Sequence, residues 1–357
     1  MLDNKVILVT GGTGTFGRRL VRTLLDRYSP RKVIVYSRDE QKHFEMNQQF
    51  PENPKLRYFI GDVRDRERLY RALDGVDIVV HAAAMKHVHL GEYNPMEVIK
   101  TNVLGSANVI DAAIDCDVKK VIALSTDKAA NPINLYGAAK LCADKLFTAA
   151  NSYSGYHKTR FSVVRYGNVS GSKGSVIPFF LKTARENGTL PITDPRMTRF
   201  WITLQQGVNF VLQSLDRMQG GEIFVPKLPS VRLVDIARAV APDAQVEVVG
   251  IRPGEKLHEV MVPGDDARHT VEHDTHYTIL PQFPEWHEEG YRDKVGGTRC
   301  SDGFCYSSDT NDQWLDTEAL REIVDEADRA TDNPEVHPTG RADLRAFHAP
   351  RLASNGS

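Results

Sequence analysis

The stretch STDKAANPINLYGAAK concentrates side chains that can move protons. It places Thr126, Asp127 and Lys128 in a row and follows them with Tyr136 and Lys140. On a helix, residues four apart project from one face, so the phenol and the second amine should lie together. An ammonium group next to a phenol favours the phenolate, so we expect a lowered pKa for Tyr136. The tyrosine could then act as a base toward a substrate hydroxyl.

Each of these residues also has an ordinary structural interpretation. A Tyr-x-x-x-Lys pair is common on exposed helix faces, Asp127 could cap a helix, and Lys128 could form an ion pair with it. The order of the motifs favours catalysis, because the stretch follows a buried strand and lies downstream of a glycine-rich turn.

That turn, TGGTGTFG, occupies residues 10–17, between the apolar run KVILV and a helix that we expect to begin near Thr15. Gly11, Gly14 and Gly17 would permit a pyrophosphate to approach the amino end of the helix. The alternative is a turn that only needs small residues. The strand-turn-helix context favours dinucleotide binding.

The end of the second expected strand, VYSRDEQK, bears on the choice of cofactor. An NAD site usually has a carboxylate here for the ribose, whereas this chain has Ser37 and Arg38, with Lys42 four residues later. A hydroxyl and two cations suit a 2′-phosphate, which favours NADP. In the alternative interpretation, Arg38 and Lys42 are a solvated helix face, and Asp39 caps the helix or reaches a ribose.

Two further strand ends fit a nucleotide lying across the sheet. A carboxylate follows the third strand in GDVRD, and three alanines follow the fourth. Either could instead be a helix cap or tight packing. The residues expected to bind the cofactor are Gly11, Thr13, Gly14, Thr15, Phe16, Gly17, Ser37, Arg38, Lys42, Asp62, Val63, Ala82, Ala83, Ala84, Lys86, Asn102, Tyr136 and Lys140.

The elements that must position these residues follow a βα repeat. Short apolar runs alternate with longer segments of helical period, and strands joined through helices must run parallel. We therefore predict an α/β fold, a Rossmann-type doubly wound parallel sheet with a smaller C-terminal substrate-binding lobe. The expected strands are 5–9, 32–37, 56–60, 77–84, 119–126 and 161–169.

The domain organisation follows from the loss of this rhythm. Residues 1–169 are expected to form the NADP-binding Rossmann domain with the catalytic residues. From 170 to 330, Pro and Gly interrupt shorter elements, as in a smaller lobe over the strand ends, and some segments could return to the first domain. Residues 331–357 are expected to be a partly mobile tail.

Composition excludes several classes of protein. The 45 basic and 47 acidic residues give a net charge of −2, so no overall field favours nucleic acid or a membrane surface. No apolar run reaches the roughly 18–20 residues needed to span a bilayer. The 4 cysteines are too few for a disulfide framework, and the chain starts without a secretory signal, so we expect a cytoplasmic protein. Its histidine pairs lack accompanying ligands, so no metal site is expected.

Taken together, the motifs resemble the extended short-chain dehydrogenase/reductase family and, within it, the inverting UDP-N-acetylglucosamine 4,6-dehydratases of bacterial surface-sugar biosynthesis. The close spacing of STDK and YxxxK distinguishes this subfamily from the sugar epimerases of the same fold. The resemblance rests on TGGTGTFG, VYSRDEQK, AAAMKHVHLGEYNP, TNVLGS, STDKAANPINLYGAAK, RYGNVSGSKGSVIPFF, GEIFVPKLPS, RPGEKLHE and GFCYSSDTNDQWL.

The resemblance implies a division of chemical labour. Tyr136, with Lys140, would assist oxidation at C4 of the sugar, Lys128 would take the C5 proton, and Asp127 would protonate the departing C6 hydroxyl; Thr126 completes the catalytic set. Lys128 can act as a base only when neutral, so we expect burial or Lys140 to lower its pKa and expect a raised pKa for Asp127. Tyr136 is the candidate for returning a proton to C5 with inversion.

The resemblance also implies a cofactor, NADP, a substrate, UDP-N-acetylglucosamine, and a homo-oligomer. Arg199 is among the residues expected to bind the substrate, but it could instead form a surface ion pair. Residues 331–357 and the Cys300-Cys305 spacing depart from the family pattern. The expected substrate-binding residues are Lys86, His87, Asn168, Lys173, Ser175, Arg199, Arg252 and Glu255.

Two other functions stay open. A UDP-hexose 4-epimerase would need the glycine turn and the Tyr136-Lys140 pair, but would have no use for Asp127 and Lys128 as an elimination pair. A non-catalytic NADP or nucleotide-sugar sensor would keep the fold and lose part of the catalytic set, and here the set is complete.

Overall fold

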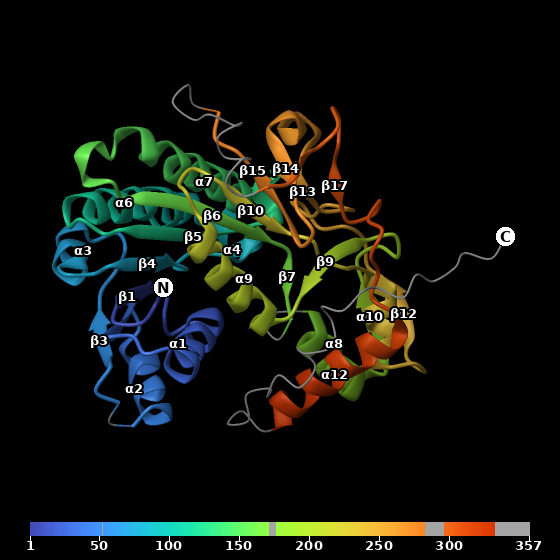
Figure 1. Ribbon diagram of the computed structural model, residues 1–357. Coiled ribbons are helices and arrows are strands. Elements are labelled where there is room, and N and C mark those ends of the chain that lie inside the picture. The colour runs from blue at the N-terminus through green and yellow to red at the C-terminus, as the bar shows by residue number, and fades with distance from the viewer. Residues whose placement is uncertain (52, 171–175, 283–295, 333–357) are drawn as a thin grey trace.

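A computed structural model describes residues 1–51, 53–170, 176–282 and 296–332. Its centre is a ten-stranded sheet in the order β16-β14-β15-β10-β6-β5-β4-β1-β2-β3 (Figure 1). The run from β3 to β10 is parallel. The first six strands are β1 (Val6–Thr10), β2 (Lys32–Ser37), β3 (Leu56–Ile60), β4 (Ile78–His81), β5 (Lys120–Thr126) and β6 (Arg160–Tyr166).

Helical crossovers connect these strands and cover both faces of the sheet. Helices α3, α6 and α7 pack side by side on one face, and α1 packs against α9 on the other (Figure 1). Strands buried on both faces are nearly continuous apolar runs, and β1 is buried along its whole length. The doubly wound fold is therefore confirmed. The helices are α1 (Thr15–Arg27), α2 (Glu40–Gln49), α3 (Arg66–Leu73), α6 (Gly105–Asp115), α7 (Leu135–Tyr153) and α9 (Leu204–Arg217).

The sheet continues with strands from the second half of the chain. β10 (Ile223–Pro226) extends it in parallel next to β6, and β15 (His276–Ile279) then runs antiparallel to β10. β14 (Thr270–Glu272) and β16 (Thr298–Arg299) complete that edge. Segments after residue 169 thus return to the large sheet, and a domain boundary at that residue stays a prediction.

A second core lies beside the sheet. It centres on Ile177, Phe180, Trp201, Ile236 and Leu320, all buried. Three helices pack around it, each with one apolar face turned inward (Figure 1). The elements of this region are α8 (Val176–Asn187), α10 (Leu233–Val240), α12 (Thr317–Asp332), β7 (Asn168–Val169), β8 (Thr189–Ile192), β9 (Thr198–Ile202), β11 (Ser230–Arg232), β12 (Gln245–Val248), β13 (Val260–Val262) and β17 (Tyr306–Ser307).

The connections include several short helices, one of them unusual. After β4 come α4 (Val88–Tyr93), α5 (Pro95–Val98) and a π-helix, η1 (Ile99–Leu104), before α6. The 3₁₀ helices are η2 (Asp127–Ala129), η3 (Gly155–His157) and η4 (Gly264–His269). The expected tail begins inside α12, which ends at Asp332, and residues 333–357 lie outside the described part.

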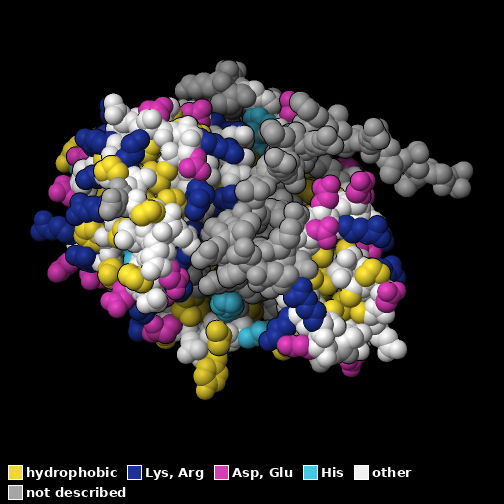
Figure 2. Space-filling model, turned by 90° about the horizontal axis from the view of Figure 1, so that it is seen from below, with side chains coloured by type: hydrophobic (Ala, Val, Ile, Leu, Met, Phe, Trp, Pro, Cys, Tyr) yellow, Lys and Arg dark blue, Asp and Glu magenta, His cyan; other side chains and the backbone are white. Residues whose placement is uncertain are grey.

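The surface charges and the cysteines are arranged as the near-neutral net charge and the small number of cysteines suggest. Basic and acidic side chains are interspersed on the face shown in Figure 2. All 4 cysteines are free thiols, Cys300 and Cys305 among them. Across the described ranges, no helix combines the length and the apolar character needed to cross a membrane.

Candidate active site

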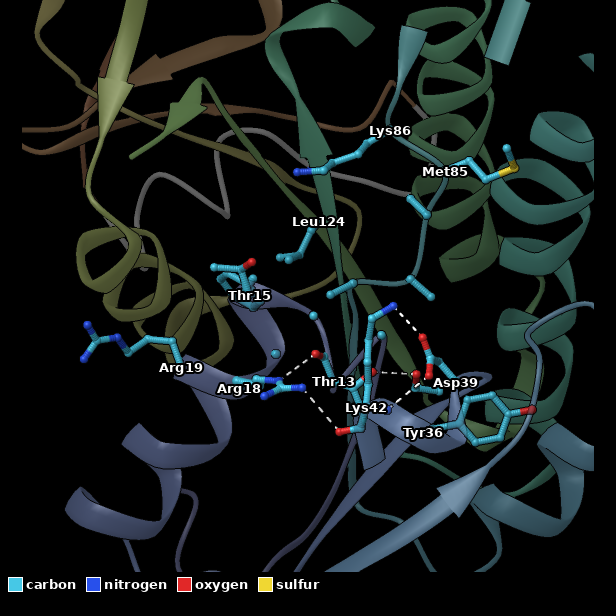
Figure 3. Close-up of a pocket in the computed structure, with 18 of the residues that line it drawn as sticks. Thr13, Thr15, Arg18, Arg19, Tyr36, Asp39, Lys42, Met85, Lys86 and Leu124 are labelled. Carbon is cyan, nitrogen blue, oxygen red and sulfur yellow. Dashed lines mark hydrogen bonds and ion pairs between the residues drawn. The ribbon is translucent and has the colours of Figure 1, made fainter. Parts of the chain in front are cut away.

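A cleft of about 1350 Å³ runs along the carboxyl ends of the parallel strands (Figure 3). Residues that follow β1, β2, β3 and β4 line it, together with Thr126, Tyr136 and Lys140 from the stretch STDKAANPINLYGAAK, which we call the catalytic stretch after its predicted role. Every residue that we expected to bind the cofactor lines this cleft, except Asn102. The fold therefore brings segments far apart in the sequence to one site, and their binding of NADP stays a prediction.

The glycine turn has the shape that a pyrophosphate needs. Gly11 has a φ of 64°, and a Cβ there would lie 2.9 Å from the backbone nitrogen of Ala83. A Cβ on Gly17 would lie 2.5 Å from the Cα of Gly12, so the helix can approach the strand only without one. Gly14, the N-cap of α1, has no side chain to accept from the first turn of the helix. The N–H groups of that turn are the kind that bind anions.

Charged groups surround the end of β2 (Figure 3). Thr13 Oγ1 and Ser37 Oγ lie 2.7 Å apart, which joins the glycine turn to this strand. Arg38 pairs with Asp62 at 3.6 Å, and Lys42 pairs with Asp39 at 2.6 Å. Asp39 also accepts from the backbone of Lys42 as the N-cap of α2, so its alternative role as a cap is confirmed.

Asn102 has a different position from the one we expected. It lies buried in the π-helix, where Nδ2 donates to the Met85 carbonyl at 2.9 Å and Oδ1 accepts from the Met85 backbone N–H at 2.8 Å. This double hydrogen bond holds the loop that follows β4. Asn102 therefore shapes the cleft from behind, without lining it.

The acid and amine of the catalytic stretch form a buried pair at the end of β5. Thr126 Oγ1 donates to Asp127 Oδ1 at 2.8 Å, and Lys128 Nζ donates to the same oxygen at 3.1 Å. Asp127 is 1% exposed, and no described group hydrogen-bonds its second oxygen, Oδ2. Thr126, not Asp127, caps the short helix η2, so the alternative that Asp127 is a helix cap is wrong.

Helix α7 places the phenol beside this pair. Asn134 caps the helix by accepting from the Gly137 N–H at 2.8 Å, and Lys140 Nζ donates to the Leu124 carbonyl at 2.5 Å. Burial raises the pKa of Tyr136 to about 12, although Lys128 and a hydrogen bond with Thr126 act to lower it. The expected lowering of this pKa by Lys140 is therefore wrong.

Lys128 also departs from the expectation. Burial acts to lower its pKa, but the carboxylates of Asp127 and Glu259 outweigh burial, and the pKa rises above that of an ordinary lysine. The Lys128 amine lies 3.2 Å from Glu259 Oε1. The resting side chain is thus an ammonium held between two carboxylates. The pKa of Lys140, in contrast, is lowered by burial.

Sequence reasoning missed Glu259 and Lys256, which belong to the motif RPGEKLHE. Glu259 is 2% exposed, and Lys256 Nζ donates to the Ala130 carbonyl at 2.6 Å. The residues of this motif that are predicted to bind the substrate are Arg252 and Glu255, but neither lines the cleft, and Arg252 is exposed. The only sequence signal for Glu259 was its position as a carboxylate at the end of RPGEKLHE, a motif that also contains Arg, Lys and His.

The other predicted substrate residues are spread over three situations. Lys86 and His87 line the cleft. Asn168, in β7, has a buried Oδ1 without a hydrogen-bond partner among the described residues. Arg199 is only 14% exposed and donates to the carbonyls of Thr198, Leu257 and Lys256, so it is not a surface ion pair. Lys173 and Ser175 lie outside the described residues.

The structure combines three features: a doubly wound sheet, a glycine turn at the amino end of a helix, and a helix that carries Tyr-x-x-x-Lys. The turn and this helix share one cleft, and together these features define an extended short-chain dehydrogenase/reductase. The sequence model of a family described as "Polysaccharide biosynthesis protein" matches residues 7–281. The chain belongs to this family. The resemblance found in the sequence is therefore confirmed.

Similar proteins with assigned functions include dehydratases and epimerases. The UDP-N-acetylglucosamine 4,6-dehydratase (inverting) of Campylobacter jejuni subsp. jejuni is 55% identical over 91% of this chain and 98% of its own. The UDP-glucose 4-epimerase of Rickettsia canadensis is 39% identical over 78% of this chain and 84% of its own. Among solved structures, Pen from Bacillus thuringiensis has a TM-score of 0.81 at 36% identity, covering 90% of this chain and 98% of that one.

Proposed function

We propose that this protein is a 4,6-dehydratase of UDP-N-acetylglucosamine that uses NADP. It would oxidise C4, remove water from C5 and C6, and invert the configuration at C5. The product would be UDP-2-acetamido-2,6-dideoxy-beta-L-arabino-hexos-4-ulose. The observation that carries the proposal is the buried Asp127-Lys128 pair at the end of β5, next to Tyr136, which lines the cleft of the glycine turn. The high identity to the Campylobacter dehydratase supports it.

The cleft fits a dinucleotide. Gly11, Gly14 and the first turn of α1 would hold the pyrophosphate, while Ser37, Arg38 and Lys42 would hold the 2′-phosphate of NADP. When bound, NADP would supply the hydride acceptor for oxidation at C4 of the sugar and the hydride donor for reduction at C6. Asp62 would compete with the phosphate for Arg38, and Asp39 for Lys42, so the preference for NADP depends on how these pairs rearrange.

Tyr136 serves the first step. Its phenolate oxygen would take the proton of the C4 hydroxyl as the hydride leaves, so the raised pKa of about 12 must fall and the phenol must first lose its own proton. Lys128 and Thr126 both act in that direction. Lys140 Nζ, bound to the Leu124 carbonyl, holds the base of the helix against β5.

Asp127 and Lys128 serve the elimination. In the resting pair, the proton lies on the amine. Transfer along the 3.1 Å contact from Lys128 Nζ to Asp127 Oδ1 gives a neutral amine and a carboxylic acid, which are the base and the acid that elimination needs. The amine then takes the C5 proton, Asp127 gives its proton to the departing C6 oxygen, and water leaves. The original ion pair is restored.

One rival function has a specific observation behind it. The Rickettsia relatives at 39–41% identity are named UDP-glucose 4-epimerases. An epimerase oxidises C4 with the same tyrosine and returns the hydride to C4. It therefore has no use for the buried Asp127-Lys128 pair, which favours the dehydratase.

Incubation with UDP-N-acetylglucosamine in heavy water separates the two functions. A dehydratase product is lighter by one water and carries solvent deuterium at C5, and NMR coupling constants give the inverted configuration there. An epimerase product has an unchanged composition. Recovery of the 4-epimer alone would overturn the proposal.

Three further parts of the proposal concern the cell. We infer a cytoplasmic homo-oligomer that supplies bacterial surface-sugar biosynthesis, in keeping with the family description. Light scattering of the purified full chain tests its assembly. Loss of surface glycan in a deletion strain tests the cellular role.

A further inference from the structure

The Lys128 amine belongs to a cluster of five charged groups. Asp127 and Glu259 are almost completely buried, at 1% and 2% exposure. Lys128, Arg199 and Lys256 supply the opposite charges, with 26%, 14% and 12% of their side chains exposed. The buried carboxylate of Glu259 takes no part in the proposed reaction, and this raises the question of its role.

Burial of a carboxylate is costly unless cations and hydrogen bonds compensate it. Glu259 Oε1 lies 3.2 Å from Lys128 Nζ and 3.9 Å from Arg199 Nε, and its Oε2 lies 3.9 Å from Lys256 Nζ. Lys128 therefore makes the shortest of these three contacts. Glu259 Oε2 has no hydrogen-bond partner among the described residues.

The other two cations have structural contacts of their own. Arg199 donates to the carbonyls of Thr198, Leu257 and Lys256. Lys256 donates to the carbonyl of Ala130, within the loop between the catalytic residues. Both are thus fixed by the backbone, whereas the Lys128 amine lies against the carboxylates of Asp127 and Glu259.

We propose that Glu259 is a positioning residue for the elimination step, which anchors the Lys128 ammonium opposite Asp127 and controls when that amine releases its proton. The proposal rests on the function proposed above for Lys128. Glu259 would not touch the substrate. It would act through the amine, as the second of two carboxylates that share one cation.

The charges around Lys128 give the direction of the effect. Burial and the Arg199 guanidinium favour the neutral amine, and the carboxylates of Asp127 and Glu259 favour the ammonium. Lys256 adds a further positive charge beside Glu259, while Thr126 and Tyr136 contribute neutral groups. Without the Glu259 charge, Asp127 is the only carboxylate of the cluster that favours the ammonium, while Arg199 and Lys256 still favour the neutral amine. The pKa of Lys128 should therefore fall.

The first test is the pH profile of Glu259→Gln. The variant keeps the shape and loses the charge. One limb of the plot of dehydration rate against pH should follow the titration of Lys128. This limb should move to lower pH whether the rate needs the neutral amine or the ammonium, because both forms depend on the same pKa. Glu259→Asp retains the charge and should keep the limb near its wild-type position. Glu247→Gln, an exposed change on β12, is the matched control.

The second test is independent of activity. In competitive labelling with trace acetic anhydride, the rate at each lysine follows its neutral fraction, and mass spectrometry of peptides reads every site. Lys128 should react about tenfold faster in Glu259→Gln for each unit by which its pKa falls, measured against the exposed Lys145 of the same chain. Glu259→Asp should label like the wild type.

The outcomes separate the two proposals. If the wild type fails to dehydrate UDP-N-acetylglucosamine, the proposed function fails, and the labelling still decides the role of Glu259. Circular dichroism checks that each variant is folded. If Glu259→Gln does not fold, unchanged slow labelling in Glu259→Asp supports the charge effect, and fast labelling there contradicts it. A folded Glu259→Gln with wild-type profile and labelling overturns the proposal.

Discussion

Tyr136 lines the cleft and lies close enough to Lys128 to feel its charge, yet the proposed mechanism uses the two residues in different steps. Tyr136→Phe removes the hydroxyl that takes the C4 proton, so it should block the appearance of reduced cofactor. Lys128→Ala leaves that hydroxyl in place, so reduced cofactor should accumulate transiently while the dehydrated product is lost. Rapid-mixing absorbance of the reduced nicotinamide measures the first step, and mass spectrometry measures the second.

Lys128→Arg is an informative companion to this pair, because it keeps the positive charge between Asp127 and Glu259 but cannot lose its proton. It should behave like Lys128→Ala in the elimination. Dehydration at near wild-type rate by Lys128→Ala would instead make the lysine only an ion-pair partner of Asp127, and another residue would have to take the C5 proton.

Arg38 is the residue on which cofactor preference most depends. It is half-exposed at the end of β2, where it pairs with Asp62 at 3.6 Å. We expect NADP to bind more tightly than NAD, and Arg38→Ala to narrow the difference by about 1–3 kcal/mol, the range of a charge-assisted hydrogen bond. Titration by calorimetry measures both affinities. Arg71→Ala, an exposed change on α3, should alter neither, and equal affinities in the wild type would contradict the expectation.

The catalytic stretch shows how far single residues can be predicted from sequence. The spacing of Tyr136 and Lys140 predicted their shared helix face, because a helical period is a local property. The raised pKa of Lys128 was only partly predictable: its neighbour Asp127 is the larger cause, but Glu259 also raises this pKa, and a distant segment brings that carboxylate to 3.2 Å. Residues that act through tertiary contacts cannot be recognised from the local spacing of residues in the sequence.

At the scale of elements, the amino end of α7 packs directly on the backbone of η2. A Cβ on Gly137 would lie 2.2 Å from the Lys128 carbonyl oxygen, so only glycine lets the helix approach so closely. Gly137→Ala should therefore push α7 and η2 apart, lower the free energy of unfolding by about 1–3 kcal/mol and reduce turnover. Urea denaturation and the dehydration rate measure the two effects.

Gly207 in α9 provides the matched control for this substitution. A Cβ there would meet its nearest neighbour, Ile202, at 3.9 Å, an ordinary contact. Gly207→Ala should raise the free energy of unfolding by up to about 1 kcal/mol, because alanine is the better helix former. Equal stability of the two variants would show that the contact at Lys128 relaxes without cost.

The elements themselves were predictable where their pattern is local. Apolar runs between helical segments predicted the six parallel strands to within a few residues. The π-helix Ile99–Leu104 was not, since its sequence fits an ordinary helix and its extra residue per turn places Asn102 against Met85. The short strands β14 and β16 were also missed, because strands of two or three residues are too short to show a periodic pattern.

At the scale of the whole molecule, one buried ion pair joins the sheet, the catalytic helix and the second half of the chain. Arg165 in β6 pairs with Asp144 of α7 at 3.2 Å and donates to the Met261 carbonyl in β13 at 2.9 Å. Asp144 also accepts from Ser125, the residue before Thr126, at 2.8 Å. The segment that carries Glu259 is thus held in register with the stretch that carries Lys128.

The whole molecule should also lose stability in mild acid through a buried histidine. His81, 1% exposed in β4, contacts Thr10 at 2.8 Å and Ser106 at 3.3 Å. Burial, with a contribution from the Lys140 charge, lowers its pKa from 6.5 to about 3. Between these values the unfolded chain binds a proton that the folded chain does not. The stabilisation is therefore complete above about pH 6.5 and is lost as the pH falls toward 3, at about 1.4 kcal/mol per pH unit.

His81→Gln tests this effect because it keeps a donor and an acceptor between the two hydroxyls but cannot titrate. The variant should be less stable at neutral pH, yet its free energy of unfolding should fall less steeply between pH 6 and pH 4 than that of the wild type, by about 1 kcal/mol per pH unit. Urea denaturation at a series of pH values measures the slope. The exposed His89→Gln should keep the wild-type slope. If His81→Gln keeps it too, the imidazole must accept its proton without unfolding, and acid sensitivity must come from other groups.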